Sequence, residues 1–306
     1  MITWTEIYPP GGTPADQDWK TSSISTDGKY ILAGTWNGTG DSLYLSSDFG
    51  STWAQIYSGS IADVSMSSDG KYILMSNSTS AFDLRGRLYL SSNYGSSWTE
   101  IYPPGGTPET QDWGSTVNKN VSISANGKYM LAVTTDTQLS TQYGTLYLSS
   151  DFGSTWAQIY STVGYSFDIF SISADGKYIL AGSYQDKVYF SSNYGITWVI
   201  AINEYYYWDT SSISADGKYI LAGRLAAVGT LYLSSDFGST WAQIFPPEGT
   251  PGGTPWYTSS ISANGKYMLA GGSLRLYLGL ATTIIEQNIF TGRFPWQIKG
   301  INLRRA

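Results

Sequence analysis

The sequence predicts an all-β protein, a six-bladed β-propeller whose blades are four-stranded antiparallel sheets. Two observations lead to this prediction. The composition favours strands and tight turns, with 34 glycines and 15% aromatic residues against only 13% charged residues. Two short motifs also alternate along the chain, and internal repetition at this period is typical of propellers.

The first motif marks the inner half of each unit. It reads Ser-Ile-Ser-x-Asp/Asn-Gly-Lys-Tyr-Ile/Met-Leu, with small variations, and occurs six times. Its glycines are Gly28, Gly70, Gly127, Gly176, Gly217 and Gly265. Successive glycines are 41 to 57 residues apart, which is the length of a four-stranded blade. The Asp-Gly or Asn-Gly pair predicts a two-residue type I′ hairpin, in which both central residues need a positive φ.

The second motif marks the outer half of each unit. It reads Leu-Tyr-Leu-Ser-Ser-Asp/Asn-Phe/Tyr-Gly-x-Thr/Ser-Trp, and its five complete copies end at Trp53, Trp98, Trp156, Trp198 and Trp241. A sixth copy begins at Leu276 and departs from the pattern after Leu278. Residues 4–10 repeat residues 98–104, which form the strand after a motif. We therefore expect the N-terminal strand to close the last blade, because closure removes an exposed edge.

Residues 46–53, which read Ser-x-Asp-x-Gly-x-Thr-Trp, resemble the Asp-box, also called the bacterial neuraminidase repeat. The resemblance covers about residues 1–280 and implies a propeller of the sialidase-like superfamily. In that family the Asp caps backbone amides of a hairpin and the Trp packs between blades. The resemblance thus implies a structural role for Asp48, Asn93, Asp151, Asn193 and Asp236. Residues 281–306 are expected to form a C-terminal tail that anchors or assembles the domain.

The composition excludes several kinds of chemistry. The chain has no Cys and no His, so it lacks disulfides, a Ser-His-Asp triad and the commonest zinc ligands. No cofactor and no metal site are predicted. The net charge of −6 argues against nucleic acid as a partner. No run of about 18 apolar residues is present, so no membrane span is expected, and no signal peptide is visible.

Candidate ligand-binding residues lie in the connections that diverge between repeats, where a rigid scaffold usually carries recognition. Aromatic rings suit sugar binding because pyranose C–H groups stack on them. The candidates are Trp19, Trp113, Trp208, Trp256 and Tyr206. The alternative is that these rings fill gaps between blades. A second candidate feature is a ring of lysines after the Asp/Asn-Gly pairs, which either docks an acidic partner or is simply solvated.

The sequence is compatible with two functions. The first is a non-catalytic structural or recognition module, displayed on an extracellular or virion surface, that binds a glycan or a protein through its divergent face. The tail would join it to a larger assembly. The second is a glycoside hydrolase of sialidase type using Arg85, Arg224, Arg275 and Glu204. The Phe/Tyr-Arg-Ile-Pro element of that family is absent near the N-terminus, which favours the first function.

Overall fold

The computed structural model describes most of the repeat region. The described residues are 19–35, 41–77, 86–101, 113, 121–136, 143–163, 167–183, 185–224, 230–244, 256–272, 276–280 and 298–300. Every regular element within these ranges is a strand, and the strands form six four-stranded antiparallel sheets. The chain divides into two compact units, Met1–Ser166 and Phe167–Ala306, with three sheets each. The all-β prediction is confirmed for these residues.

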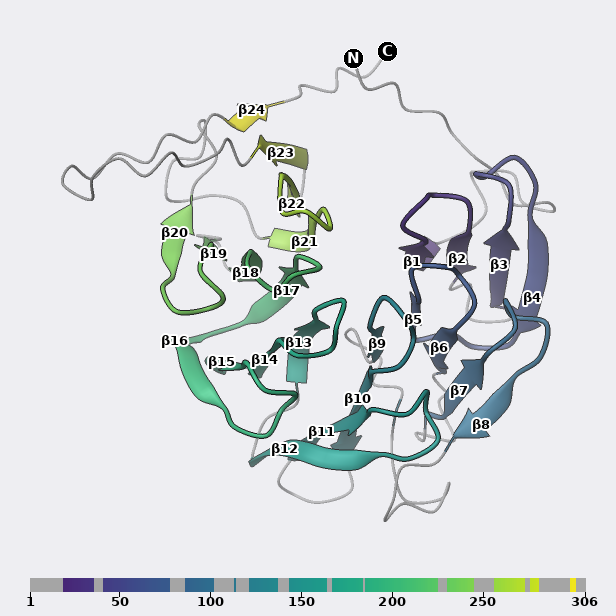
Figure 1. The fold of residues 1–306 in the computed structure, drawn as a ribbon, viewed down its shortest axis with the longest axis horizontal. Coiled ribbons are helices and arrows are strands. Elements are labelled where there is room, and N and C mark those ends of the chain that lie inside the picture. Colours follow the sequence, from purple (N-terminus) through teal and green to yellow (C-terminus); the bar gives the residue numbers. More distant parts are fainter. Residues whose placement is uncertain are drawn as a thin grey trace. The chain divides into compact units, whose positions relative to one another are not determined.

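The first unit contains the sheets β1–β4, β5–β8 and β9–β12, in which sequence order and spatial order agree (Figure 1). Their strands are β1 (Trp19–Ile24), β2 (Ile31–Thr35), β3 (Ser42–Ser46), β4 (Ala54–Ser58), β5 (Asp63–Met66), β6 (Ile73–Ser76), β7 (Leu88–Ser91), β8 (Thr99–Ile101), β9 (Val121–Ile123), β10 (Met130–Asp136), β11 (Tyr143–Ser149) and β12 (Ala157–Val163). The four predicted strand segments of a repeat therefore become the four strands of one sheet.

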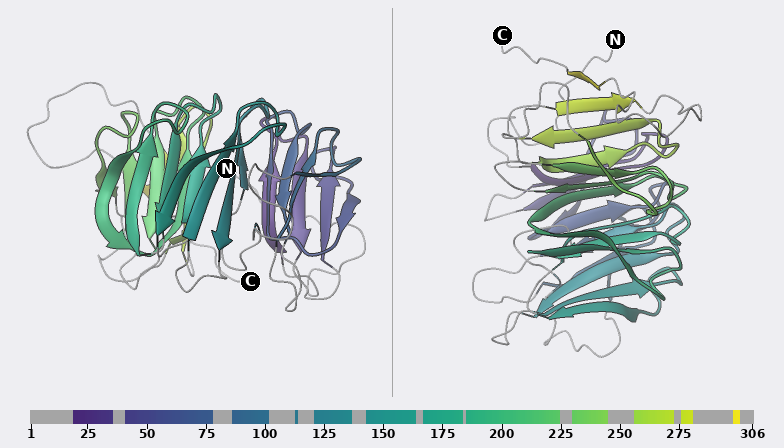
Figure 2. Two further views of the ribbon diagram at one scale, coloured as in Figure 1. Left: turned by 90° about the horizontal axis from the view of Figure 1, so that it is seen from below. Right: turned by 90° about the vertical axis from the view of Figure 1, so that its left-hand side faces the viewer.

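The second unit repeats this arrangement in the sheets β13–β16, β17–β20 and β21–β24. Their strands are β13 (Phe167–Ile172), β14 (Ile179–Ser183), β15 (Asp186–Ser191), β16 (Val199–Tyr206), β17 (Trp208–Ile213), β18 (Ile220–Arg224), β19 (Leu231–Ser234), β20 (Ala242–Ile244), β21 (Trp256–Ile261), β22 (Tyr267–Gly272), β23 (Leu276–Leu280) and β24 (Ile298–Gly300). Figure 2 shows the strands of each sheet side by side with alternating directions.

The last sheet differs from the prediction in the origin of its fourth strand. The strand beside β23 is β24, with Leu278 opposite Lys299, and it comes from the C-terminal tail. Residues 4–10, which the sequence assigned to this place, lie outside the described residues. The physical reason for a distant partner is that β23 lacks the turn motif that would lead directly into a fourth strand. Closure of six blades into one ring stays a prediction.

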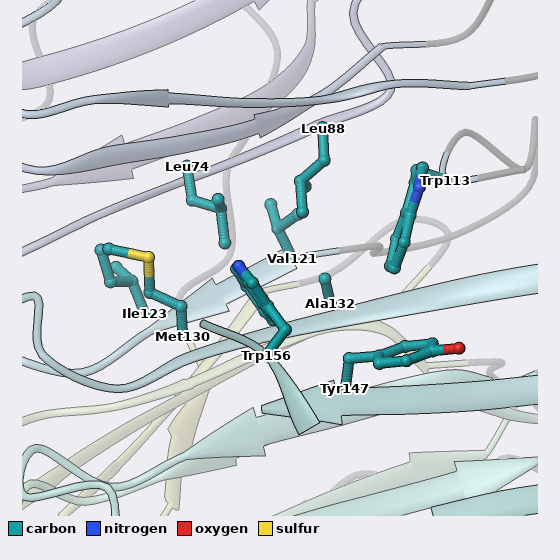
Figure 3. Close-up of a cluster of buried hydrophobic side chains, with 9 residues drawn as sticks. All are labelled: Leu74, Leu88, Trp113, Val121, Ile123, Met130, Ala132, Tyr147 and Trp156. Carbon is teal, nitrogen blue, oxygen red and sulfur yellow. The ribbon is translucent and has the colours of Figure 1, made fainter. Parts of the chain in front are cut away.

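The core of each unit lies between neighbouring sheets. In the first unit, Leu74 and Leu88 of the second sheet meet Val121, Met130 and Trp156 of the third (Figure 3). These side chains are at most 4% exposed. Burial of this apolar surface, at about 25 cal/mol per Å² removed from water, is the main force that holds neighbouring sheets together.

The inner hairpins differ from the predicted two-residue type. Residues 26–29 connect Ser25 to Tyr30, whose carbonyl accepts a bond from the Ser25 amide. Only Gly28 has a positive φ, of 77°. Asp27 keeps a negative φ because its carboxylate accepts bonds from the Ser25 hydroxyl and the Lys29 amide. These side-chain bonds stabilise a longer turn that needs one glycine instead of two residues with positive φ.

Inner turns also join neighbouring sheets within each unit. In the first unit the Thr26 amide donates to the Ser68 carbonyl and the Ser68 amide to the Ala125 carbonyl, at 3.0 and 2.8 Å. In the second unit the Ala174 amide donates to Ala215 and the Ala215 amide to Ala263, both at 3.0 Å. Within each unit, neighbouring sheets are thus bonded through corresponding backbone positions, which fixes the spacing of the loops between strands.

Candidate functional site

The five Ser-x-Asp/Asn-x-Gly turns, here called box turns, are self-contained structures. The carboxylate of Asp48 accepts bonds from the Thr52 amide at 2.8 Å and the Thr52 hydroxyl at 2.6 Å. Asn93 makes the corresponding bonds with Ser97, at 2.9 Å each. Asp151, Asn193 and Asp236 make the same bonds with the threonines of their own turns.

Hydrogen bonds control the charge of the box carboxylates. The Thr52 hydroxyl and amide hold the pKa of Asp48 below its usual value. Burial tends to raise the pKa of Asp151 and Asp236, but bonds from their box threonines outweigh it and the pKa is lowered. These aspartates therefore stay ionised in mildly acidic solution.

The lysines of the inner turns share one local geometry. Each ammonium lies over the ring of the tyrosine that follows it, with Nζ 4.8 to 5.4 Å from the centroid at Lys29, Lys71, Lys128, Lys177, Lys218 and Lys266. The inner and box turns also carry seven aspartates beside these six lysines. The local charge is thus balanced, which favours a structural role for the lysines.

The structure separates the predicted ligand-binding tryptophans into two groups. Trp113 and Trp208 are 6% and 1% exposed, so their rings pack inside the units and present no face to a sugar. Trp113 lies against Tyr147 with centroids 5.4 Å apart (Figure 3). For these two residues the gap-filling alternative describes the structure and the ligand-binding prediction is corrected. Trp19 and Trp256 begin β1 and β21, and their side chains lie outside the described residues.

One tyrosine-rich junction departs from all the other repeats. Residues 204–208, Glu-Tyr-Tyr-Tyr-Trp, end β16 and begin β17, and β16 is the longest of the outer strands. Side chains on a strand alternate between faces. Glu204 and Tyr206 therefore lie on one face of the β13–β16 sheet, and Tyr205 lies on the other.

The first face holds a polar cluster between the β13–β16 and β17–β20 sheets. The Tyr232 hydroxyl donates to Glu204 Oε2 at 2.6 Å and accepts from Gln243 Nε2 at 3.0 Å. The Arg224 guanidinium carbon lies 4.0 Å from the centroid of the Tyr206 ring. Trp208 packs edge-on against Tyr232 and donates its indole N–H to the Asp186 carbonyl. Tyr206, a predicted ligand-binding residue, therefore contacts Arg224 within this polar cluster.

Burial governs the chemistry of this polar cluster. Tyr232 is 4% exposed, and this desolvation, together with the bond to Glu204, raises the pKa of the phenol well above its usual value. Tyr232 therefore remains a neutral hydrogen-bond donor at physiological pH. Burial and protonation of the phenol both oppose its use as a nucleophile in this arrangement.

Tyr205 lies on the second face and Tyr207 follows directly after β16, and each has a partner from the β14–β15 hairpin. We call Gln185, Lys187, Tyr205 and Tyr207 the tyrosine platform. Tyr205 and Tyr207 are 65% and 38% exposed. Asp186 at the start of β15 pairs with Tyr206, which brings the hairpin to this end of β16. Lys187 Nζ lies 5.1 Å from the Tyr205 centroid, and Gln185 Nε2 donates to the Tyr207 hydroxyl. Exposed aromatic rings held this way are suited to recognition.

The arginines of the hydrolase alternative are only partly described. Arg224 belongs to the polar cluster with Glu204, whereas Arg85 and Arg275 lie outside the described residues. Arg87, in the same divergent hairpin as Arg85, forms an ion pair with Glu100 at 3.2 Å. Only Arg224 and Glu204 of the four predicted residues are therefore brought together in the part of the chain that is described.

Sequence reasoning missed most of the tyrosine platform. Gln185 and Lys187 were not predicted, and Tyr205 and Tyr207 were recognised only as part of the aromatic segment 204–208, from which Tyr206 and Trp208 were chosen. Tyr232 was missed because it occupies a position that is tyrosine in every repeat. Within the described residues, no group of acidic side chains could hold a metal ion, and no helix is long and apolar enough to cross a membrane.

Comparison with solved structures is informative about the fold. A GH74 enzyme of Niastella koreensis superposes with a TM-score of 0.63 at 12% identity, over 85% of this chain. YCF48 from Cyanidioschyzon merolae gives 0.58 at 13% identity over 87%, and TolB from Acinetobacter baumannii 0.51 at 18% over 74%. These are propeller proteins. The fold is of the β-propeller type.

The extent of the match differs between these propellers. The chain covers 83% of YCF48 and 53% of TolB but only 45% of the GH74 enzyme, so it spans about half the length of that protein. No protein-family model matches the sequence, and no curated protein matches it. The propeller architecture is therefore shown, and membership of the Asp-box family is not.

Proposed function

We propose that this propeller is a non-catalytic recognition module that binds a glycan or a protein through its divergent loops. The supporting observation is the tyrosine platform, in which exposed rings are held by specific partners instead of being packed. Rigid aromatic surface binds ligands at low entropic cost because few rotamers are lost. The run of three consecutive tyrosines at this junction occurs nowhere else in the sequence.

Propeller neighbours serve both kinds of function. One solved structure that this chain resembles is YCF48 bound to D1 peptide, with a TM-score of 0.57 at 16% identity, and another is a GH74 xyloglucanase from Xanthomonas campestris. A fold that carries both peptide binding and glycoside hydrolysis does not select between them. The choice depends on the site, and the exposed platform favours binding.

The direct test combines a glycan array with a peptide array, probed with the whole chain and with Tyr207→Ala. We expect retained ligands on one array and their loss in the variant. Trp113→Tyr is a matched control, because it changes a buried ring in the other unit. Binding that is equal in Tyr207→Ala and the whole chain would contradict the proposal.

A sialidase-type hydrolase is a second candidate because the Tyr232–Glu204 pair and Arg224 are side by side in the polar cluster. In such chemistry the glutamate takes the phenol proton as the tyrosine oxygen attacks. The burial of Tyr232 opposes this use. A fluorogenic sialoside distinguishes the two functions, since turnover that disappears in both Arg224→Ala and Tyr232→Phe would establish the enzyme.

Display on an extracellular or virion surface, with attachment through the tail, completes the proposal. Attachment can be tested by deletion within the tail. Deletion of all of residues 281–306 would also remove β24, the strand that pairs with β23, so a shorter deletion is needed. Deletion of residues 301–306 spares β24 and removes Arg304 and Arg305. We expect this shorter chain to keep its fold and lose its assembly, measured by light scattering with the neighbouring component.

A further inference from the structure

The hairpin that carries the tyrosine platform is the shortest of its kind in the chain. Two residues join β14 to β15, whereas between three and eleven residues join the corresponding strands of the other sheets. Gln185 in this hairpin has a φ of 54°. Among the described residues it is the only non-glycine residue outside the box turns with a positive φ. Strained backbone of this kind is often retained where a side chain must be presented in one direction.

The side chains of the platform form two pairs that join the β14–β15 hairpin to the end of β16 and the residue after it. Lys187 in β15 pairs with Tyr205 in β16, and Gln185 and Tyr207 lie directly outside these strands. Gln185 fixes the Tyr207 hydroxyl and Lys187 covers part of the Tyr205 ring. Both tyrosines thus have a specific partner within the chain itself.

The acidic groups near the platform accept hydrogen bonds from tyrosines, whereas its lysine forms no ion pair within the part of the chain that is described. Asp186 accepts a bond from the Tyr189 hydroxyl at 3.1 Å, and Glu204 accepts one from Tyr232 at 2.6 Å. Both neighbouring carboxylates are therefore engaged by phenols. Lys187 forms no ion pair with any residue that the structure describes, and its contact is with the Tyr205 ring. The platform consequently offers an ammonium and an amide as donors, which match an acceptor-rich anion.

We propose that the tyrosine platform binds an acidic glycan that contains uronate units. The pyranose rings stack on Tyr205 and Tyr207, and a uronate carboxylate contacts Lys187. This inference rests on the proposed recognition function and specifies its ligand. An acidic peptide fits less well, because extended peptides pair with straight strand edges. Register shifts opposite Val188 bend β16, and bulges of this kind protect an edge from pairing.

The test is calorimetric titration of the whole chain with a hexamer of galacturonic acid and with its fully methyl-esterified form, which has the same rings but no charge. We expect the acid form to bind at least tenfold more tightly. Lys187→Gln should lower affinity for the acid form about tenfold and leave the ester unaffected. Tyr207→Leu should weaken both forms. Raising the salt from 50 to 500 mM should reduce only the binding of the acid form.

Lys218→Gln is the matched control, because Lys218 Nζ lies 5.4 Å from the centroid of Tyr219 in the same Lys-on-Tyr geometry without an exposed platform. Affinity in this variant should equal that of the unchanged chain. Equal binding of acid and ester would overturn the uronate inference while supporting glycan recognition. Equal binding of a hexamer of glutamate would overturn the choice of a glycan. Absence of binding to all three probes would overturn the inference, and the arrays would then decide the proposed function independently.

Discussion

Two corresponding inter-sheet regions, one in each unit, show how the repeat accommodates change. Between β1–β4 and β5–β8, the third-strand Tyr89 meets Tyr57, with centroids 5.9 Å apart, and Trp98 completes an aromatic group. Between β13–β16 and β17–β20, the equivalent Tyr232 meets Glu204 through a hydrogen bond.

The scaffold residue is the same in both regions. On the outer strand of the preceding sheet it meets an aromatic ring in the first region, and in the second it meets a carboxylate that lies two residues further along the strand. The third strand of each sheet keeps the same tyrosine, whereas the sequence of the outer strand and of the junction that follows it varies between repeats. Burial raises the pKa of Tyr57 and of Tyr89, as it does for Tyr232. A polar site can therefore form by substitutions on the outer strand alone, while the other strands of the sheet stay unchanged.

The largest expected effect comes from the tryptophans of the two regions. Trp208→Ala removes a ring that is 1% exposed and should lower the free energy of unfolding by about 3–5 kcal/mol. Trp98→Ala should cost less, because Trp98 is only half-buried although its indole also donates to a carbonyl, that of Ile56. Urea denaturation followed by circular dichroism measures both. Equal losses would show that the two regions pack alike.

The constant tyrosines give an intermediate effect. Tyr232→Phe leaves Glu204 and Gln243 without their shared partner and should cost about 1–2 kcal/mol at pH 7. Tyr89→Phe should cost less, because Tyr89 is more exposed. The raised pKa of Tyr232 means that its contribution is complete below the ordinary tyrosine pKa of about 10 and declines as pH rises above it. The difference in the free energy of unfolding between the unchanged chain and Tyr232→Phe should therefore become smaller when urea denaturation is measured at alkaline pH.

The box turns of the same two sheets give the smallest effect, since one contains Asn93 and the other Asp236. Asp236→Asn should lower stability at pH 7 by less than about 1 kcal/mol, because the amide makes nearly the same bonds. The lowered pKa of Asp236 means that its stabilisation is present above the ordinary value of about 3.9 and is lost as pH falls through the folded value. The difference between Asp236→Asn and the unchanged chain should shrink as the pH falls below the ordinary value. Thermal melts between pH 3 and 7 check this, with Asn93→Asp as the reciprocal change.

Much of the fold was predictable because the same turn and strand residues recur in every repeat. The box glycines, the inner glycines and the strand segments all appear where the motifs indicate. Gly217 shows the double constraint, with a φ of 78° and space so limited that an added Cβ would lie 2.1 Å from a Tyr178 ring carbon. The type I′ hairpin was wrong because Asp27 uses its side chain to hold a longer turn.

The site was less predictable because it depends on register and burial. Composition shows that Trp208 and Tyr205 are both aromatic, but only the structure shows that one is 1% and the other 65% exposed. Likewise, nothing in the sequence pairs Lys187 with Tyr205 until the register of β15 and β16 is known. The origin of the strand beside β23 was missed because a three-residue strand carries little pattern.

The backbone bonds between inner turns constrain how chain length can vary. Each links a sheet only to its immediate neighbour, and always through the same position, as Thr26 to Ser68 and Ser68 to Ala125. A duplicated or deleted repeat restores every such bond at the new junction, whereas a fragment of a repeat leaves donors without acceptors. Related genes are accordingly expected to differ in length by whole repeats.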